Sequence, residues 1–276
     1  MQTGKKRASA VLRAKEERSQ MSSPWNPDQY HRFQNERSQP FFDLLALVEP
    51  APGGDAIDLG CGTGELTKIL HEKAQAKTTI GLDSSETMLA KAHAYAGDGL
   101  WFAQGNIDSF AGDFDIVFSN AALQWLNDHE ALIPSVAAHV RPGGQLAFQV
   151  PANADHPSHL IAHDAAREEP FATALGGYTR DWPVLPPERY AEMLDALGFG
   201  ELHVRLQVYG HHLESSDGVI EWVKGTLLTD YERRMPPELY QRYLARYREL
   251  LLAEIGEHSP YFYAFKRILV RGRKLS

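Results

Sequence analysis

The chain has 276 residues, of which 43% are hydrophobic and 23% charged, a composition typical of a folded globular domain and not of a disordered chain. It carries 28 lysines and arginines against 36 aspartates and glutamates, and the resulting net charge of −8 argues against a protein that coats nucleic acid. Cys61 is the only cysteine, which excludes an intramolecular disulfide and a multi-cysteine zinc site and fits a reducing, cytoplasmic compartment. The longest apolar runs, such as residues 44–48, are too short to span a bilayer.

The first twenty residues differ from the rest of the chain in charge. They contain six lysines or arginines and two glutamates, and they lack the apolar stretch of a secretory signal. We interpret residues 1–22 as a disordered basic tail, or as the product of a start codon assigned upstream of Met21. A single domain then spans residues 23–276.

From Gln39 onward, patterns typical of helices and strands alternate. Helices are predicted over residues 39–49, 65–73, 86–95 and 130–140, and strands over residues 56–59, 78–83, 100–103, 114–118 and 145–150. Strands separated by helices of this length imply right-handed crossovers between parallel strands. The expected fold class is therefore α/β, with a doubly wound, mostly parallel sheet whose core covers about residues 50–150.

The second half of the chain follows a different pattern. It predicts a helix over residues 186–197 and two strands over residues 202–209 and 263–270. Between these strands lie two stretches with helical spacing, residues 217–228 and 236–257. We expect a late antiparallel strand pair that completes a seven-stranded sheet. A helical lid, residues 151–185 and 211–259, is inserted before the last strand.

A glycine-rich turn follows the first strand, at the carboxyl edge where open α/β sheets bind ligands. Asp58 begins the sequence DLGCGTG, whose glycines are Gly60, Gly62 and Gly64. A dinucleotide-binding loop has the spacing GxGxxG and holds a pyrophosphate, which a preceding carboxylate would repel. Asp83 ends the second strand, where a carboxylate can accept hydrogen bonds from both hydroxyls of a ribose. Together these features predict S-adenosylmethionine, which carries a ribose, an ammonium and a sulfonium group.

This set, with the Pro-Gly-Gly turn at residues 142–144, resembles the class I S-adenosylmethionine-dependent methyltransferases over roughly residues 55–150. The resemblance implies a Rossmann-like methyltransferase fold. It also implies that Asn106 and Ile107 flank the adenine and that Asn120 lines the methionine end of the cofactor. Relatives more often have aspartate at position 106, but the carbonyl of an asparagine can still accept a hydrogen bond from the adenine amino group.

The wider sequence is similar to the trans-aconitate methyltransferases over nearly all of residues 24–271. The matching segments, in chain order, are residues 25–33, 120–125, 149–153, 222–226 and 262–267. The resemblance implies methyl transfer from S-adenosylmethionine to a carboxylate of trans-aconitate, which gives a monomethyl ester. The alternative is a carboxyl O-methyltransferase of the same fold that acts on another acid, such as a malonyl thioester on acyl carrier protein. We expect a monomer that acts on a small tricarboxylate and contacts neither nucleic acid nor a membrane.

A tricarboxylate is trianionic near neutral pH, so an acidic protein must concentrate cations at its acceptor site. Arginine pairs and tyrosine hydroxyls are the expected partners. The predicted acceptor-binding residues are Tyr30, Arg37, Gln124, Trp125, Arg180, Lys224 and Lys266, with Tyr178, Thr226, Arg233, Arg234 and Arg267 as further candidates. Lys224 and Arg180 are favoured because each lies in a lid segment beside glycine and aromatic residues.

No general base is predicted, because a carboxylate acceptor is already ionised at pH 7. No metal site is predicted either: His156, His159 and His163 have helical spacing, but Pro157 interrupts them and no cysteine completes a ligand set. Two rival functions remain at this point. A cofactor-binding sensor would keep the glycine loop without room for an acceptor, and a nicotinamide enzyme would need a different loop spacing.

Overall fold

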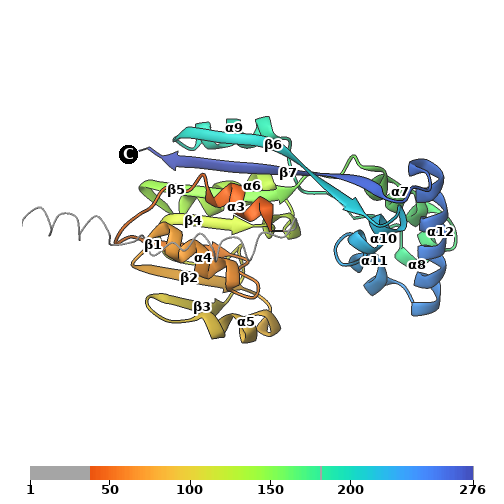
Figure 1. The fold of residues 1–276 in the computed structure, drawn as a ribbon, viewed down its shortest axis with the longest axis horizontal. Helices are drawn as coiled ribbons and strands as arrows, with labels where there is room; N and C mark the ends of the chain where they lie inside the picture. The colour runs from red at the N-terminus through yellow and green to blue at the C-terminus, as the bar shows by residue number, and fades with distance from the viewer. Residues whose placement is uncertain (1–37, 181, 276) are drawn as a thin grey trace, which may run out of the picture.

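The computed structural model describes residues 38–180 and 182–275, which form a seven-stranded sheet with helices on both faces (Figure 1). The strand order is β3-β2-β1-β4-β5-β7-β6. The strands are β1 (Asp55–Leu59), β2 (Thr78–Asp83), β3 (Leu100–Gln104), β4 (Phe114–Asn120), β5 (Val140–Pro151), β6 (Phe199–Leu213) and β7 (Tyr261–Lys274). Among the described strands, β7 pairs antiparallel with both β5 and β6, and all other pairs are parallel. The predicted fold class is confirmed.

The helices divide into a group that covers the sheet and a group that forms a separate helical lobe. The first group is α3 (Gln39–Leu45), α4 (Glu65–Ala74), α5 (Glu86–Ala92), α6 (His129–Ala138) and α9 (Pro187–Ala196), with short 3-10 turns η1 (His93–Tyr95) and η2 (Leu123–Trp125). The helical lobe consists of α7 (Pro157–Arg167), α8 (Phe171–Leu175), α10 (Asp217–Lys224), α11 (Thr229–Arg234) and α12 (Pro237–Ile255).

The central strands are apolar on both faces because helices cover both sides of the sheet. On one face, Ile57 of β1 packs in a cluster with Val136 of α6 and Leu194 of α9. On the other face, Ala56 lies in a cluster with Phe41 of α3 and with residues of α4. Burial on both faces explains why β1 is apolar from Ala56 to Leu59 except at Asp58.

The helical lobe is connected to the sheet by its two longest strands. β6 and β7 pair from Phe199 with Lys274 to Leu213 with Tyr261, so they continue past the sheet as a two-stranded ribbon (Figure 1). The lobe has an apolar core of its own, in which Tyr243 is fully buried. The hydroxyl of Tyr243 donates a hydrogen bond to the carbonyl oxygen of Ala162, 2.9 Å away, and thereby joins α12 to α7. The helices of the two predicted lid segments therefore pack as one body.

Several predicted boundaries were wrong. The helix predicted over residues 39–49 ends at Leu45, because the next residues turn toward Pro50. The helix predicted over residues 217–228 ends at Lys224, before Gly225, and α11 follows as a separate helix. Both late strands are longer than predicted. At one end, residues 210–213 of β6 and 261–262 of β7 are paired in the ribbon, and at the other end residues 271–273 of β7 pair with β5 inside the sheet. No helix among the described residues combines the length and the apolar character that crossing a membrane requires.

Candidate active site

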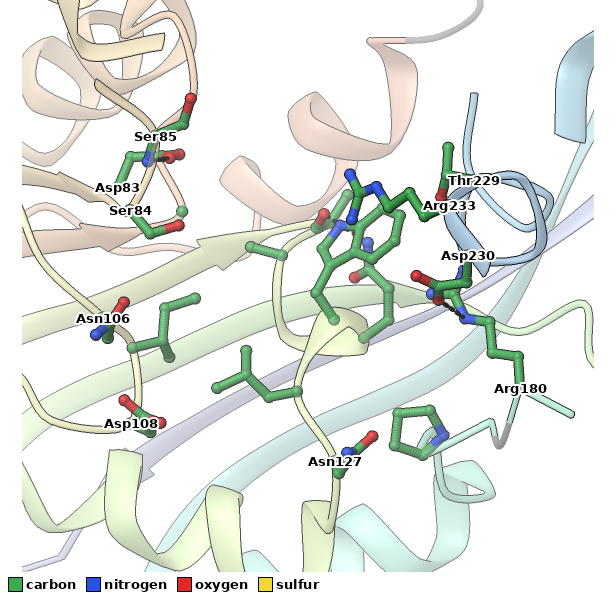
Figure 2. A pocket seen from close by; sticks show the side chains of 18 of the residues that line it. Asp83, Ser84, Ser85, Asn106, Asp108, Asn127, Arg180, Thr229, Asp230 and Arg233 are labelled. Atoms are coloured by element: carbon green, nitrogen blue, oxygen red, sulfur yellow. Dashed lines mark hydrogen bonds and ion pairs between the residues drawn. The ribbon is translucent and has the colours of Figure 1, made fainter. Parts of the chain in front are cut away.

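A cavity of about 1290 Å³ lies at the carboxyl edge of the parallel strands and is closed on one side by the helical lobe. Its polar groups are gathered at two ends (Figure 2): Asp83, Ser84 and Ser85 at one end and residues of the lobe at the other. The wall is formed by Gly60, Gly62, Asp83, Ser84, Ser85, Met88, Gly105, Asn106, Ile107, Asp108, Ala121, Ala122, Gln124, Trp125, Leu126, Asn127, Gly177, Tyr178, Thr179, Arg180, Pro183, Gly225, Thr229, Asp230, Arg233 and Arg234.

The three glycines of the predicted loop have different structural roles. All three have positive φ angles, which only glycine adopts without strain. A Cβ on Gly60 would lie 2.2 Å from the Cβ of Ala122, and one on Gly64 would lie 2.7 Å from the ring of Phe102. A Cβ on Gly62 would meet nothing within 4 Å, and Gly62 borders the cavity. Gly62 therefore leaves its backbone open to a ligand, whereas Gly64 is a packing position away from the wall.

Asp83 lies on the cavity wall with its carboxylate held by two backbone amides. The amide of Gly62 donates to one oxygen and the amide of Ser85 to the other, each at 2.8 Å. Each oxygen retains a lone pair, so the carboxylate can accept further hydrogen bonds from a ligand with two neighbouring hydroxyls. The position at the end of β2 is the one from which the sequence predicted ribose recognition.

Asp58 lies behind the glycine loop and not on the cavity wall. Its side chain is 3% exposed and its Oδ2 accepts a hydrogen bond from the hydroxyl of Thr67 at 2.6 Å. The other carboxylate oxygen is buried without a hydrogen-bond partner. Burial, with a smaller contribution from the nearby charge of Asp83, raises the pKa of Asp58 to about 7, although the hydrogen bond from Thr67 acts in the opposite direction. The carboxyl group that was predicted to bind the cofactor directly therefore lies behind the loop and does not line the cavity.

The loops after β3 and β4 form the floor of the cavity. Asn106 and Ile107 line it, and Asp108, for which no role was predicted, lies near Asn106 (Figure 2). Asn120 does not line the wall, and its Oδ1 instead accepts a hydrogen bond of 2.6 Å from the side-chain amide of Gln149. The residue after it, Ala121, lines the wall and has a φ of 54°, a strained conformation for a residue other than glycine.

At the opposite end, Arg180 reaches the cavity from the segment before α9. It is 7% exposed, donates to the carbonyl oxygen of Thr226 at 3.1 Å, and lies 3.6 Å from the carboxylate of Asp230. Its guanidinium also lies over the ring of Trp125, 4.7 Å from the ring centroid. Trp125 is 51% exposed, so this cation–π contact joins the helical lobe to the sheet across the cavity.

Two further arginines of α11 line the same end of the cavity. The guanidinium of Arg234 lies over the ring of Tyr178, 3.8 Å from its centroid. Arg233 makes no ion pair with another described residue and points to the cavity (Figure 2). Arg180, Arg233 and Arg234 line this end of the cavity, and Asp230 is the one acidic residue of the lobe among the described residues of the wall. Three positive charges and one negative charge leave a net charge of +2 at this end. This end of the cavity is therefore suited to a ligand with more than one carboxylate.

The two predicted lysines lie away from the wall. The ammonium of Lys224 pairs with Glu221 at 2.5 Å on the exposed side of α10, and that of Lys266 pairs with Asp155 at 2.5 Å. Gln124 does line the cavity, with its amide donating to the carbonyl oxygen of Ala121. Tyr30 and Arg37 lie outside the described residues. Ser84, Ser85, Asn127 and Asp230 were not predicted as site residues, because serine, asparagine and aspartate are common in loops and helix caps of any kind.

Comparisons with known proteins agree with this geometry. A family profile described as a methyltransferase domain matches residues 30–203. The chain is 47% identical over 251 residues to a trans-aconitate 2-methyltransferase of Deinococcus radiodurans, covering 89% of this chain and 96% of that protein. It is 38% identical over 239 residues to a protein of the same name from Streptomyces avermitilis, covering 82% of this chain and 88% of that protein.

Solved structures show the same fold at low sequence identity. The YcgJ protein of Bacillus subtilis has a TM-score of 0.57 at 16% identity, covering 86% of this chain and 99% of that one. Phosphoethanolamine N-methyltransferase 2 of Haemonchus contortus, solved in complex with S-adenosyl-L-methionine, has a TM-score of 0.52 at 15% identity, covering 87% of this chain and 53% of that one.

Proposed function

Because this chain belongs to the methyltransferase family and is closely similar to its trans-aconitate 2-methyltransferases, we propose that it transfers a methyl group from S-adenosylmethionine to a carboxylate of trans-aconitate, giving a monomethyl ester. The observation that carries this proposal is the two-ended cavity. A carboxylate suited to a ribose lies at one end and a group of arginines suited to a polycarboxylate at the other.

The residues at the sheet end fit the methyl donor. Asp83 is oriented by two amides toward hydroxyl donors, and Gly62 leaves the loop backbone open. Asn106 and Ile107 line the same cavity, and we assign them to the adenine. Asp58 contributes a negative charge behind the loop when it is ionised, which favours a cationic ligand without touching it. When bound, the donor supplies a methyl group activated by a positively charged sulfur.

The residues at the lobe end fit the acceptor. We assign Arg180, Arg233 and Arg234 to its carboxylates, with Trp125 and Gln124 shaping the wall between the two ends. Three arginines against Asp230 leave two positive charges, which matches the two carboxylates of a tricarboxylate that do not react. The third carboxylate is then free of a cationic partner, and an oxygen without such a partner is the better nucleophile.

The chain needs to supply no general base for this reaction, because the acceptor is already ionised at neutral pH. Neither histidine nor lysine lines the cavity among the described residues. The contribution of the protein is alignment of the two substrates and exclusion of water, which in favourable intramolecular systems lowers a barrier by about 7–11 kcal/mol. The lobe, which covers the cavity and contacts the sheet through Arg180 and Trp125, provides both.

The direct test is transfer of labelled methyl from S-adenosylmethionine to a panel of small acids. We expect turnover with trans-aconitate, little with its cis isomer or with dicarboxylates, and a monomethyl ester as the product. Equal turnover with monocarboxylates, or activity confined to a malonyl thioester on acyl carrier protein, would overturn the proposal.

A matched pair of variants tests the acceptor assignment. Arg233→Met removes a cation on the cavity wall, whereas Lys224→Met removes one that pairs with Glu221 outside it. We expect Arg233→Met to raise the KM for trans-aconitate about tenfold, as for a lost charge-assisted hydrogen bond, and Lys224→Met to leave it unchanged. Affinity for the methyl donor, measured by calorimetry, serves as the control and is expected to stay the same in both variants. An equal rise in KM for both would refute the placement of the acceptor.

A further inference from the structure

Asp230 is an acidic residue on the part of the cavity wall that carries the arginines. It lies on α11 three and four residues before Arg233 and Arg234, so the three side chains share one face of this helix. Figure 2 shows its carboxylate directed toward Arg180. A negative charge at this place repels every carboxylate of an acceptor and lowers the affinity of the site for a polyanion. Affinity alone would therefore favour an uncharged residue at position 230.

Arg180 is held in place by contacts other than that with Asp230. The Nε of Arg180 and the Oδ2 of Asp230 are 3.6 Å apart, which is longer than a hydrogen bond. The guanidinium donates instead to the carbonyl oxygen of Thr226 at 3.1 Å and stacks on Trp125. The backbone amide of Arg180 donates to the hydroxyl of Tyr231 at 3.4 Å. What Asp230 adds to Arg180 is therefore mainly a compensating charge.

Arg180 is also the arginine of this wall that stacks on the sheet half of the protein. The ring centroid of Trp125 lies 4.7 Å from its guanidinium, and Trp125 belongs to η2, the turn that follows β4. Arg234, in contrast, lies over the ring of Tyr178 within the lobe. Because the methyl donor is assigned to the sheet end of the cavity, the reacting carboxylate must lie on the side of the acceptor site that faces the sheet, which is the side of Arg180.

The charges of the reaction decide what a cation at this place does. A lone pair of the acceptor oxygen forms the new C–O bond, and the electrons of the breaking C–S bond stay on the sulfur. A carboxylate and a sulfonium thereby become a neutral ester and a neutral thioether, and no proton moves. A positive charge beside the reacting oxygen therefore stabilises the reactants more than the transition state and slows the transfer. A carboxylate beside that cation reduces this penalty.

We propose that Asp230 is a specificity-determining residue that offsets the charge of Arg180 and thereby selects which carboxylate of the acceptor is methylated. Arg233 and Arg234 hold two carboxylates of the acceptor, and the third lies beside the neutralised Arg180 and reacts. The inference rests on the proposed function, because it requires a polycarboxylate acceptor and a sulfonium donor in this cavity.

The test compares Asp230→Asn with the control Glu232→Gln, which makes the same change of charge on the same helix. Glu232 is exposed and does not line the cavity. Asparagine keeps the shape and one acceptor oxygen of Asp230, so a role limited to orienting Arg180 survives the substitution. Asp230→Glu keeps the charge and serves as the conservative variant. Unfolding midpoints in urea and the Kd of S-adenosylhomocysteine establish that each variant is folded and has an intact donor site.

Two quantities are measured with trans-aconitate: its Kd by calorimetry in the presence of S-adenosylhomocysteine, and kcat at saturating methyl donor. We expect Asp230→Asn to bind the acid about tenfold more tightly, as for the gain of a charge-assisted hydrogen bond, and to turn over about tenfold more slowly. Glu232→Gln should keep both wild-type values, and Asp230→Glu should stay closer to the wild type than Asp230→Asn.

Three results of this comparison would overturn the proposal. A lower kcat without tighter binding would show that Asp230 only orients Arg180. Wild-type values of both quantities in Asp230→Asn would show that its charge is not used. Equal effects of Asp230→Asn and Glu232→Gln would show a general effect of net charge.

A second measurement needs no variant and decides the question even if Asp230→Asn does not fold. Itaconate, mesaconate and cis-glutaconate each lack a different carboxylate of trans-aconitate. If the reacting carboxylate has no net cationic partner, the wild type should bind one of these three acids about as tightly as trans-aconitate. The methyl ester should then form at the carboxylate that this dicarboxylate lacks. An ester at another carboxylate, or equally weak binding of all three dicarboxylates, would refute the proposal.

Failure of the proposed function gives a different result. If the wild type methylates another polycarboxylate and not trans-aconitate, the acceptor is wrong, and the comparison of Asp230→Asn with Glu232→Gln on that acid decides the role of Asp230. If the wild type methylates no acid with more than one carboxylate, both proposals are wrong.

Discussion

Replacing Asp58 by asparagine should change the pH dependence of folding stability in a specific way. The carboxyl group is buried, one of its oxygens accepts a hydrogen bond from Thr67, and the other has no partner. Burial raises its pKa from 3.8 to about 7. Between these two values the native state holds a proton that the unfolded chain releases, so this group's contribution to stability is lost as pH rises from about 4 to 7. An amide at this position does not titrate, so Asp58→Asn should lack that loss.

The magnitude follows from the same interval. A difference of one pH unit between native and unfolded pKa corresponds to 1.36 kcal/mol, so the interval from 3.8 to about 7 corresponds to about 4 kcal/mol. We therefore expect Asp58→Asn to gain stability over the wild type by about 4 kcal/mol between pH 4 and pH 8. The new amide also changes the free energy of unfolding by an amount that does not depend on pH. This constant amount cancels when the difference between the two proteins at pH 4 is subtracted from the difference at pH 8.

Urea unfolding of both proteins at pH 4, 6 and 8 measures this difference directly. A difference in unfolding free energy that is constant across this range would refute the reasoning, because Asp58 would then titrate normally in the native state. Calorimetry adds a second readout: a cationic methyl donor lowers the pKa of Asp58, so binding near pH 7 should release a proton from the wild type and none from Asp58→Asn. Equal proton release by both would separate Asp58 from the cofactor site.

Three other substitutions test the site and the lobe. Asp83→Asn replaces one acceptor oxygen with a donor and should weaken binding of S-adenosylhomocysteine about tenfold or more by calorimetry; unchanged affinity would remove the ribose assignment. Gly60→Ala places a Cβ 2.2 Å from that of Ala122 at a positive φ and should cost about 1–3 kcal/mol in urea unfolding, whereas a neutral result would mean that the loop relaxes freely. Tyr243→Phe removes the hydroxyl that bonds to Ala162 and should cost about 1–3 kcal/mol of lobe stability, seen as faster amide exchange in α7 and α12; unchanged exchange would show that packing alone holds these helices together.

The half of the molecule that binds the cofactor was predictable from sequence because local and global signals agree there. The strand over residues 78–83 was placed at its observed bounds, and Asp83 was located by its distance from the glycine loop. Both depend on short-range patterns: apolar runs for buried parallel strands and glycines where the backbone needs a positive φ. The extension of β6 and β7 past the sheet edge was not predictable, because these residues pair with each other outside any layered core.

The acceptor end was harder to predict because charge and position in sequence do not tell which way a long side chain points. Lys224 and Arg180 looked equally suitable, yet Lys224 has Glu221 three residues before it on the exposed face of α10. Within the described residues, Arg180 pairs with no such local carboxylate, and it contacts Trp125 and Thr226, which lie far from it in sequence. Tertiary contacts of this kind leave no signature in a single chain.

The ribbon formed by β6 and β7 has an evolutionary consequence. Everything between residues 213 and 261 is inserted at the tip of a hairpin whose base is anchored in the sheet, so its sequence can diverge without altering the strands that support the cofactor. Of the three arginines assigned to the acceptor, Arg233 and Arg234 belong to this insertion. Changes of acid specificity can therefore arise within this hairpin tip where its packing against α7 and α8 is kept, while the strands at its base stay unchanged.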